Sequence, residues 1–335
     1  MTKRPTLQDV ADAVGLSPAT VSYALRGQRG SAETRQRVQE AAASLGYQVD
    51  PIARALANGR SGTLAVLCGS TRDAWHRSLA TDLVRALLDR DRRAILADAD
   101  GDAERERGLL DLLSEQRADG LLVAALDPFA AHWEQAAREI PLVAIGDRLA
   151  AAPSASAVVF DNTAGFDLVL DHLAALGHRD VLVLLPERPS TPDRPAEETI
   201  RQAARARGLD VTLHRVPPAR GGDQRVDLLA RAVAGSSATA VFCLSDAYAF
   251  DVLRAARRLG LSIPGDLSLV GFEDAELSDL VGPGVTTVAW GHQHVVETAV
   301  TMLLEAVDGH RAPQVAVIAP ELVVRGTTSR PPAAN

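Results

Sequence analysis

The stretch GLSPATVSYALRG, Gly15 to Gly27, has the residue types and spacing of a short helix that contacts another molecule through its exposed face. Ser17 predicts the N-cap and Pro18 the first helical position, where the missing N–H of proline costs nothing. A helix that reads a nucleic-acid sequence usually exposes polar side chains, because hydrogen bonds distinguish the bases. Here the exposed positions carry Pro18, Ala19 and Tyr23, and the question is what such a helix reads.

Side chains that carry out catalysis are sparse in the rest of the chain. The only lysine is Lys3, which excludes a P-loop lysine and a lysine that forms a Schiff base. No GxSxG elbow occurs, and no GxGxxG follows a predicted strand. The pairs His172 with His178 and His292 with His294 lack clustered acidic or thiol companions. We therefore expect no enzyme activity, no catalytic residue, no metal site and no cofactor.

The charge of the chain is divided between a basic head and an acidic remainder. The formal net charge is −8, which would argue against a nucleic-acid partner if it were evenly spread. Residues 1–60 contain eight basic and five acidic side chains, whereas the remainder contains 27 basic and 38 acidic ones. A cationic head can bind phosphates locally, since electrostatic attraction is screened over about 10 Å.

Length and hydropathy are those of a globular protein with more than one domain. At roughly 150 residues per domain, a chain of 335 residues with 47% hydrophobic side chains predicts two or three domains. Cys68 and Cys243 lie within apolar runs, so we expect two buried thiols and no disulfide. The N-terminus lacks the apolar segment of a signal peptide, and no run approaches the ~18 apolar residues of a membrane span. We expect a cytoplasmic protein with no membrane partner.

Three short helices are predicted within the first 46 residues. The first is capped by Thr6, has apolar residues at spacings of three, four and seven, and ends at Gly15. Only a tight connection separates it from the second helix, which is the spacing of a helix-turn-helix. The third begins at Ser31 and ends at Gly46. By itself, this pattern also fits a three-helix domain that binds nothing.

From Leu64 onward, apolar strand-like runs alternate with helical patterns. The strands are predicted at LAVLC, RAILADA, GLLVAAL, LVAIGD, AVVFD, VLVLL, VTLHRV, AVFCL and LSLVGF, and the helices at 75–90, 102–117, 162–177, 195–207, 247–259 and 292–308. This alternation is typical of parallel sheets covered by helices, and so many strands exceed one sheet of typical size. We therefore expect two similar α/β lobes.

Several segments together resemble the LacI/GalR-type family of bacterial transcriptional repressors, over nearly the whole chain. They are TLQDVADAVGLSPATVSYALRG, SAETRQRVQEAAASLGY and PIARALANGRSGTLAVL, followed by IGDR, VVFDN, HLAALGHRDVLVL, LRAARRLGLSIPGDLSLVGFEDAEL, GVTTV and PELVVRGTT in the order of the family. The resemblance implies an N-terminal all-α helix-turn-helix head and hinge helix. A two-lobed α/β domain of the periplasmic-binding-protein-like type I kind, with parallel sheets, follows them.

The resemblance also implies the domain boundaries. Residues 1–48 would form the helix-turn-helix DNA-binding domain, 49–61 the hinge helix and linker, and 62–330 the effector-binding and dimerisation domain. Within the last, the first lobe would comprise about 62–160 plus 290–314 and the second about 161–289 plus 315–330. Three crossing strands would join the lobes around a cleft for the effector.

By the same resemblance, residues 17–25 lie in the major groove of DNA, with Pro18, Ala19 and Tyr23 at the bases. Proline and alanine offer only apolar contacts, such as with thymine methyls, and Tyr23 brings one hydroxyl. Arg26 replaces a common asparagine and adds a phosphate or base contact, or is simply solvated. Contacts to phosphates or sugars, which fix the register without reading sequence, are implied for Thr6, Ser17, Thr20, Ser22, Ser31, Thr34 and Tyr47.

The segment after the head matches the hinge helix of the family. Pro51 can open a helix of about two turns, which is marginal alone because isolated helices under ~12 residues rarely form in water. In the family, two hinge helices pair in the minor groove, which maps Leu56 onto a wedge in a base step and Ala53 onto the groove floor. An ordinary interface leucine is the alternative for Leu56. Val49 and Asp50 replace the usual Pro-Asn.

The resemblance implies effector contacts at strand ends that face the cleft, at Trp75, Asp147, Arg148, Asp161, Arg194, Ser245, Asp246 and Glu273. An aromatic platform with carboxylates and an arginine suits a polyhydroxylated ligand. Each of these residues has the alternative of being a strand-end or cap residue. Ala196 and Thr199 stand where the family has an arginine and, three residues later, a glycine; Arg188 or Arg194 would replace that arginine, and Glu273 stands for a customary aspartate. The effector therefore cannot be transferred from a relative.

These expectations describe a ligand-responsive transcriptional regulator, most simply a repressor, with a sugar or related metabolite as effector. A homodimer would bind a near-palindromic double-stranded operator. The C-terminus TTSRPPAAN has no heptad helix, which favours a dimer over a tetramer. The alternative is a cytoplasmic α/β protein or enzyme that binds a small molecule and no DNA.

Overall fold

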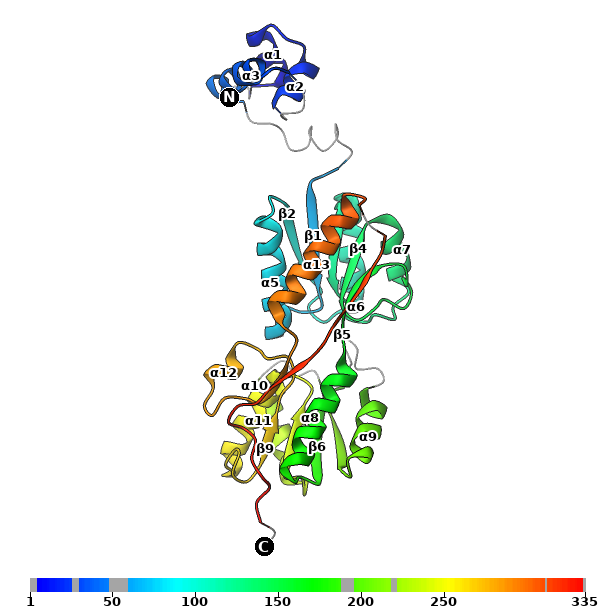
Figure 1. Ribbon diagram of the computed structural model, residues 1–335, viewed down its shortest axis with the longest axis vertical. Coiled ribbons are helices and arrows are strands. Elements are labelled where there is room, and N and C mark those ends of the chain that lie inside the picture. Colours follow the sequence, from blue (N-terminus) through cyan, green and yellow to red (C-terminus); the bar gives the residue numbers. More distant parts are fainter. Residues whose placement is uncertain are drawn as a thin grey trace. The chain divides into compact units, whose positions relative to one another are not determined.

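The computed structural model describes residues 5–25, 30–47, 60–187, 196–217, 222–310 and 312–333. The chain divides into two compact units, Met1–Ser61 and Gly62–Asn335, whose elements are labelled in Figure 1. Five residues with predicted roles lie outside the described residues, namely Arg26, Ala53, Leu56, Arg188 and Arg194.

Three helices form the described part of the first unit: α1 (Leu7–Val14), α2 (Pro18–Leu25) and α3 (Ala32–Leu45). The predicted caps are present, because the side chains of Thr6 and Ser31 accept hydrogen bonds from backbone N–H groups three residues later. Gly15 and Gly46 end α1 and α3 with φ angles of 66° and 65°, the left-handed conformation that glycine adopts without strain.

A small apolar core holds these helices together. Its buried members are Val10, Ala11, Val14, Val21, Ala24, Val38 and Ala42. Arg37 adds a link between helices, since its guanidinium donates to the backbone oxygen of Val14 at 3.2 Å. Val21 and Ala24 are fully buried, so the opposite face of α2, with Ala19 and Thr20, is exposed.

A six-stranded parallel sheet forms the first lobe of the second unit (Figure 1). Its strands, in the order β11-β5-β4-β3-β1-β2, are β11 (Val315–Ile318), β5 (Ser156–Phe160), β4 (Leu142–Gly146), β3 (Gly120–Ala124), β1 (Thr63–Cys68) and β2 (Arg93–Asp98). One apolar cluster joins one sheet face to α5 (Ala74–Leu88) and α13 (His292–Val307), and a second joins the other face to α6 (Ala103–Glu115) and α7 (His132–Glu139). Both faces are therefore covered, as the continuous apolar strands require.

The second lobe repeats this plan with four parallel strands. They are β7 (Asp210–Val216), β6 (Asp180–Pro186), β8 (Ala240–Cys243) and β9 (Ser268–Val270), in that order. One face packs on α8 (Asn162–Leu176) and α9 (Ala196–Ala206), and the other on α10 (Gly222–Ala234) and α11 (Asp246–Leu259). The short helix α12 (Leu277–Leu280) and an antiparallel pair, β10 (Thr287–Ala289) with β12 (Glu321–Val323), complete the lobe.

The chain crosses between the lobes three times, after β5, after β10 and after β11 (Figure 1). Because β11 pairs with β5, residues 315–318 belong to the sheet of the first lobe. This corrects the expected boundary, which assigned residues from 315 to the second lobe. An edge strand of four residues with partly exposed side chains gives too weak a pattern to be assigned from sequence.

Aromatic rings line the crossovers. Phe160, at the end of β5, stacks on Trp290, which follows β10, with ring centroids 4.9 Å apart. Trp290 in turn meets Phe272 edge to face at 5.4 Å. Gly165 on α8 lies against these rings, and a Cβ there would stand 3.0 Å from Phe272 and 3.4 Å from Trp290. The two lobes therefore share one apolar cluster at their junction.

The expected fold class is confirmed: a helix-turn-helix head precedes a two-lobed α/β unit with parallel sheets. Each predicted strand and helix of this unit is present, and α7, α10, α12, β10, β11 and β12 were not anticipated. Cys68 and Cys243 are buried free thiols, as expected. Among the described residues, no helix has the length and apolarity needed to cross a membrane.

Candidate functional site

The first candidate surface is the exposed face of α2 with the neighbouring helix N-termini. Ala19 and Thr20 are exposed, whereas Pro18, Ser22 and Tyr23 are half-buried. Tyr47 packs partly against the apolar core of the head. The structure therefore leaves Ala19 and Thr20 exposed on α2 and gives Tyr47 a share in packing.

Paired hydroxyls stand at the N-termini of α2 and α3. Ser17 Oγ accepts from Thr20 N at 3.2 Å and lies 2.8 Å from Thr20 Oγ1. The same arrangement recurs in α3, where Ser31 Oγ accepts from Thr34 N at 3.2 Å and lies 2.9 Å from Thr34 Oγ1. Free N–H groups, the helix dipole and hydroxyl donors at a helix N-terminus suit a phosphate oxygen.

Thr6 is more fully committed to its own helix than these pairs are. It forms a capping box, in which Asp9 N donates to Thr6 Oγ1 at 3.3 Å and Thr6 N donates to Asp9 Oδ2 at 2.7 Å. The Thr6 hydroxyl also donates to Asp9 Oδ2, at 2.7 Å. A contact from Thr6 to a phosphate would have to compete with this carboxylate.

The second candidate site lies at the junction of the lobes. The strands of the six-stranded sheet are parallel, and β5 ends at Phe160 where the chain crosses over, so the carboxyl ends of this sheet face the junction. The residues that follow β1, β4, β5, β8 and β9 include Trp75, Asp147, Asp161, Ser245 and Glu273. Ligands of open α/β sheets bind at such strand ends.

Ser245 and Glu273 are brought into direct contact. Ser245 caps α11 through Ala247 N, at 3.2 Å, and its hydroxyl donates to Glu273 Oε2 at 3.0 Å. Burial raises the pKa of the Glu273 carboxyl well above its ordinary value, and the charges of Asp73 and Asp246 raise it further. Glu273 therefore presents a poorly solvated carboxyl group that gains from any ligand able to hydrogen-bond to it.

Asp73 belongs to the other lobe, so its effect on Glu273 links the two lobes. It caps α5 through His76 N at 2.9 Å and lies 3.1 Å from His76 Nδ1. Burial opposes the charge of Asp73, but the hydrogen bond with His76 lowers the pKa of Asp73 below its ordinary value. Asp73 was not predicted from the sequence, although an aspartate two residues before Trp75, at a predicted helix start, was a signal for it.

Asp246 has a different place from the one expected. Its side chain is completely buried, and both carboxylate oxygens are occupied by donors of the second lobe. A group with no exposed surface cannot touch an effector, so we remove Asp246 from the set of contact residues. The sequence pattern could not distinguish it from Ser245, because both follow the same strand.

The remaining junction residues have mixed surroundings. Trp75 is half-buried and meets the Phe160 ring edge to face at 5.6 Å. Asp161 caps α8 through Ala164 N at 3.0 Å, so one of its oxygens is structural. Next to it, Asn162 Nδ2 is buried and, within the described part of the chain, has no hydrogen-bond partner. A buried donor without a partner is costly unless something binds it.

Asp147 and Arg148 follow β4 directly. Burial raises the pKa of the Asp147 carboxyl, which accepts from Arg148 N at 2.7 Å, while the Arg148 side chain is exposed. The structure thus brings carboxyl groups and an aromatic ring to the junction. Arg194, the remaining predicted contact, lies outside the described residues.

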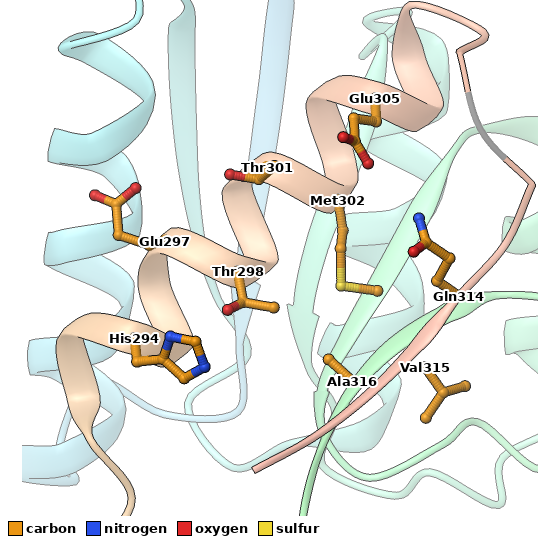
Figure 2. Close-up of a pocket in the computed structure, with 9 residues that line it drawn as sticks. All are labelled: His294, Glu297, Thr298, Thr301, Met302, Glu305, Gln314, Val315 and Ala316. Carbon is orange, nitrogen blue, oxygen red and sulfur yellow. The ribbon is translucent and has the colours of Figure 1, made fainter.

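A separate surface groove of about 370 Å³ lies on the first lobe between α13 and β11. Figure 2 shows side chains of α13, among them His294 and Glu305, on one side and Gln314 on the other, with Met302 between them. No predicted effector residue lines it. Pro313 and Pro320 flank the edge strand, which blunts it against pairing with another strand.

Two family models match the chain. The model of bacterial regulatory proteins of the lacI family matches residues 6–50, and that of a periplasmic binding protein-like domain matches residues 170–328. The HTH-type transcriptional regulator MalR of Streptomyces coelicolor is 32% identical over 342 residues, which cover 97% of this chain and 97% of MalR.

Solved structures give the same picture of the fold. The Lac repressor dimer bound to operator and the anti-inducer ONPF matches with a TM-score of 0.84 at 24% identity, over 98% of this chain and 100% of that one. The complex of the transcriptional regulator CelR with cellobiose matches with a TM-score of 0.66 at 24% identity, over 97% of this chain and 100% of that one.

Proposed function

The chain belongs to the LacI family of bacterial regulatory proteins, and we propose that it represses transcription as a homodimer on a near-palindromic operator under the control of a small molecule. The family membership agrees with the sequence prediction of a regulator over that of an enzyme. The observation that carries the proposal is the pairing, in one chain, of a capped helix-turn-helix head with a carboxyl-rich lobe junction. The proposal places the protein in the cytoplasm, and on the nucleoid when it is bound to its operator.

We propose that α2 enters the major groove with Pro18, Ala19 and Tyr23 toward the bases. Phosphates would be bound at the N-termini of α2 and α3, where backbone N–H groups and hydroxyls combine. Residues assigned to phosphate or sugar contacts are Thr6, Ser17, Thr20, Ser22, Ser31, Thr34 and Tyr47. Arg26, Ala53 and Leu56 lie outside the described residues. Arg26 keeps its proposed phosphate or base contact, and Ala53 and Leu56 keep their proposed places in the minor groove.

The effector of the proposal is a polyhydroxylated molecule, such as a sugar or a related metabolite. Hydroxyl groups can donate to Glu273, Asp147 and Asp161, while Trp75 offers an apolar face to a sugar ring. Asn162 supplies a donor to a ligand oxygen. CelR, a protein of the same fold, was solved with cellobiose, which supports this chemical class without naming the molecule.

The effector would act by changing the angle between the lobes. Asp73 and Glu273 are carboxyl groups on different lobes, and the charge of Asp73 helps to raise the pKa of Glu273, so a ligand that bridges them with hydrogen-bond donors favours a closer approach. Because operator and effector bind one molecule, each must change the affinity of the other by the same factor. Whether the effector releases the operator or strengthens its binding depends on which lobe angle it favours.

Binding of the full-length protein to the DNA that flanks its own gene tests the proposal. We expect salt-sensitive binding that is at least ~10³-fold tighter than to a scrambled duplex of the same length, measured by fluorescence anisotropy. Ala19→Glu should abolish this binding, because it adds a negative charge to the exposed face of α2. The matched control is Ala43→Glu, at an exposed position near the C-terminal end of α3. This variant should bind nearly as the parent does.

Equal affinity for the specific and scrambled duplexes, or an Ala19→Glu variant that binds as well as the parent, would remove the DNA-binding assignment. The effector is sought separately, by thermal-shift screening of sugars and nucleosides. A ligand at 100 times its Kd should raise the free energy of unfolding by about 2.7 kcal/mol.

A further inference from the structure

A buried carboxylate clamps the loop that carries Glu273. Asp246 Oδ1 accepts from Phe272 N at 2.8 Å and from Thr287 Oγ1 at 2.7 Å. Its other oxygen, Oδ2, accepts from Ala275 N at 2.7 Å and from Ser278 Oγ at 2.6 Å. One side chain on α11 thereby fixes three other segments: the loop after β9, helix α12 and strand β10.

The clamped loop has an unfavourable backbone. Glu273 has a φ angle of 118° and Asp274 a φ angle of 50°, so two successive residues that are not glycine lie in the left-handed region. Such a residue is strained and persists only where its surroundings determine its conformation. The N–H groups of Phe272 and Ala275, on either side of this pair, are the two that Asp246 binds.

The strand end is shaped to admit the carboxylate. A Cβ at Gly271 would stand 2.0 Å from Asp246 Oδ1 and 3.2 Å from Thr287 Oγ1. No side chain fits there while Asp246 remains in place, since real Cβ atoms do not approach another heavy atom so closely. Gly271 and Asp246 therefore form one structural unit.

This arrangement does not serve the stability of the lobe alone. It holds the Glu273 carboxyl, which Asp73 and Asp246 repel, in a poorly solvated position. Carboxyl groups kept where they are electrostatically unfavourable, on a strained backbone, are typical of functional sites. A loop selected only for stability would place a glycine and a neutral side chain here.

Resting on the proposed effector site at the lobe junction, we propose that Asp246 is a positioning residue that holds Glu273 in its left-handed conformation against Ser245 and ties it to β10. Glu273 N donates to Val288 O in β10 at 2.8 Å, and β10 leads directly into the crossover that carries Trp290. A ligand that moves Glu273 therefore moves a strand that connects the lobes.

A double-mutant cycle over pH tests this role with the full-length protein and no ligand or DNA. The variants are Glu273→Gln, Asp246→Asn and the double variant, and the measurement is thermal unfolding between pH 5 and pH 9. Because the folded-state pKa of Glu273 is raised, the ionised carboxyl opposes folding as the pH rises. Glu273→Gln should therefore raise Tm increasingly toward high pH in the parent.

In the Asp246→Asn background, this pH-dependent gain should shrink by at least half. The charge of Asp246 is then gone, and the loosened loop lets water reach Glu273. The matched control is Asp251→Asn, a carboxylate that is 5% exposed on the same helix and paired with Arg225 and Arg254. It should lower Tm without changing the pH-dependent gain of Glu273→Gln.

Thr287→Val provides a second route if Asp246→Asn does not fold, because it removes one donor to Asp246 and keeps the shape of the side chain. It should also reduce the pH-dependent gain. A gain that stays unchanged in either folded variant, or that is missing from the parent, overturns the positioning role. The DNA-binding proposal is tested with other variants and other readouts, so the two failures are distinguishable.

Discussion

In both the head and the lobe junction, N–H groups at helix starts and in loops need an acceptor. The two regions differ in how far along the chain that acceptor lies. In the head, Thr6, Ser17 and Ser31 each bind the N–H group three residues later. At the junction, Asp246 binds donors that lie 26 to 41 residues away. The helix caps of the head are therefore short-range hydrogen bonds that each helix makes by itself, whereas the loop that carries Glu273 is held by one carboxylate that depends on the folded lobe.

This difference predicts how each region responds to change. A local cap can be lost with the cost of one hydrogen bond, because water reaches the freed N–H group. A buried carboxylate with four donors cannot be lost so cheaply, since each donor is left without a partner and without water. The hydrogen bonds of the junction loop are concentrated on Asp246, whereas those at the helix starts of the head are divided among three separate caps.

Asp246→Ala gives the largest expected effect. We expect the free energy of unfolding of the second unit to fall by about 4 kcal/mol, because four buried donors lose their acceptor. Chemical denaturation of the full-length protein, followed by the fluorescence of its three tryptophans, measures this loss. If the free energy of unfolding falls no more than on removal of one helix cap in the head, the two regions do not differ in the way described.

Glu106→Gln tests a second buried carboxyl group that binds a donor far away in the chain. Its replacement should stabilise the protein, whereas replacement of Asp246 should destabilise it. Glu106 on α6 is fully buried, accepts from Leu126 N at 2.8 Å and faces His132 Nε2 at 3.4 Å. Burial raises the pKa of Glu106 to about 7. The protonated Glu106 carboxyl therefore makes its full contribution to stability at low pH. This contribution is lost as the pH rises through about 7, and ionisation then lowers the free energy of unfolding by roughly 3 kcal/mol.

Glutamine keeps the hydrogen bond to Leu126 and carries no charge, so Glu106→Gln should raise Tm at pH 8 and leave it nearly unchanged at pH 5. Glu139→Gln, on the exposed surface of the same lobe, is the control and should have little effect at either pH. A Glu106→Gln variant that is less stable at pH 8 than the parent would show that the buried charge is compensated.

Ser31→Ala tests the local caps. We expect a loss of about 1 kcal/mol in the stability of the head, because Thr34 N loses its acceptor. Hydrogen exchange of the α3 amides in the full-length protein measures it. Ser44→Ala, in the exposed part of the same helix, should cost nothing, and an equal loss in both variants would refute the cap.

Tyr23→Phe gives the smallest expected effect. A single hydroxyl carries less discrimination than the bidentate pairs that are worth about 1–3 kcal/mol, so selectivity for the operator should fall by less than about tenfold. Tyr47→Phe should instead weaken binding to all duplexes alike. Anisotropy titrations on single-base variants of the operator separate the two, and a collapse of selectivity in Tyr23→Phe would show that α2 reads more than its composition indicates.

The same contrast explains what could be predicted from the sequence. The caps and ends of α1 and α3, the buried positions Val21 and Ala24, and the order of strands and helices follow from residues close together in the chain. The role of Asp246 could not be predicted, because it depends on residues up to 41 positions away meeting it in the folded lobe. Asp73 was missed for a related reason, since its electrostatic effect on Glu273 acts between the two lobes.

The proposal that a small molecule controls operator binding is best tested by the reciprocal coupling of operator and effector. Once the thermal-shift screen has supplied a ligand, the Kd of the operator is measured with and without saturating ligand, and the Kd of the ligand with and without saturating operator. We expect both Kd values to change in the same direction by the same factor, about 5- to 150-fold. An operator Kd that is unchanged by saturating ligand would contradict it.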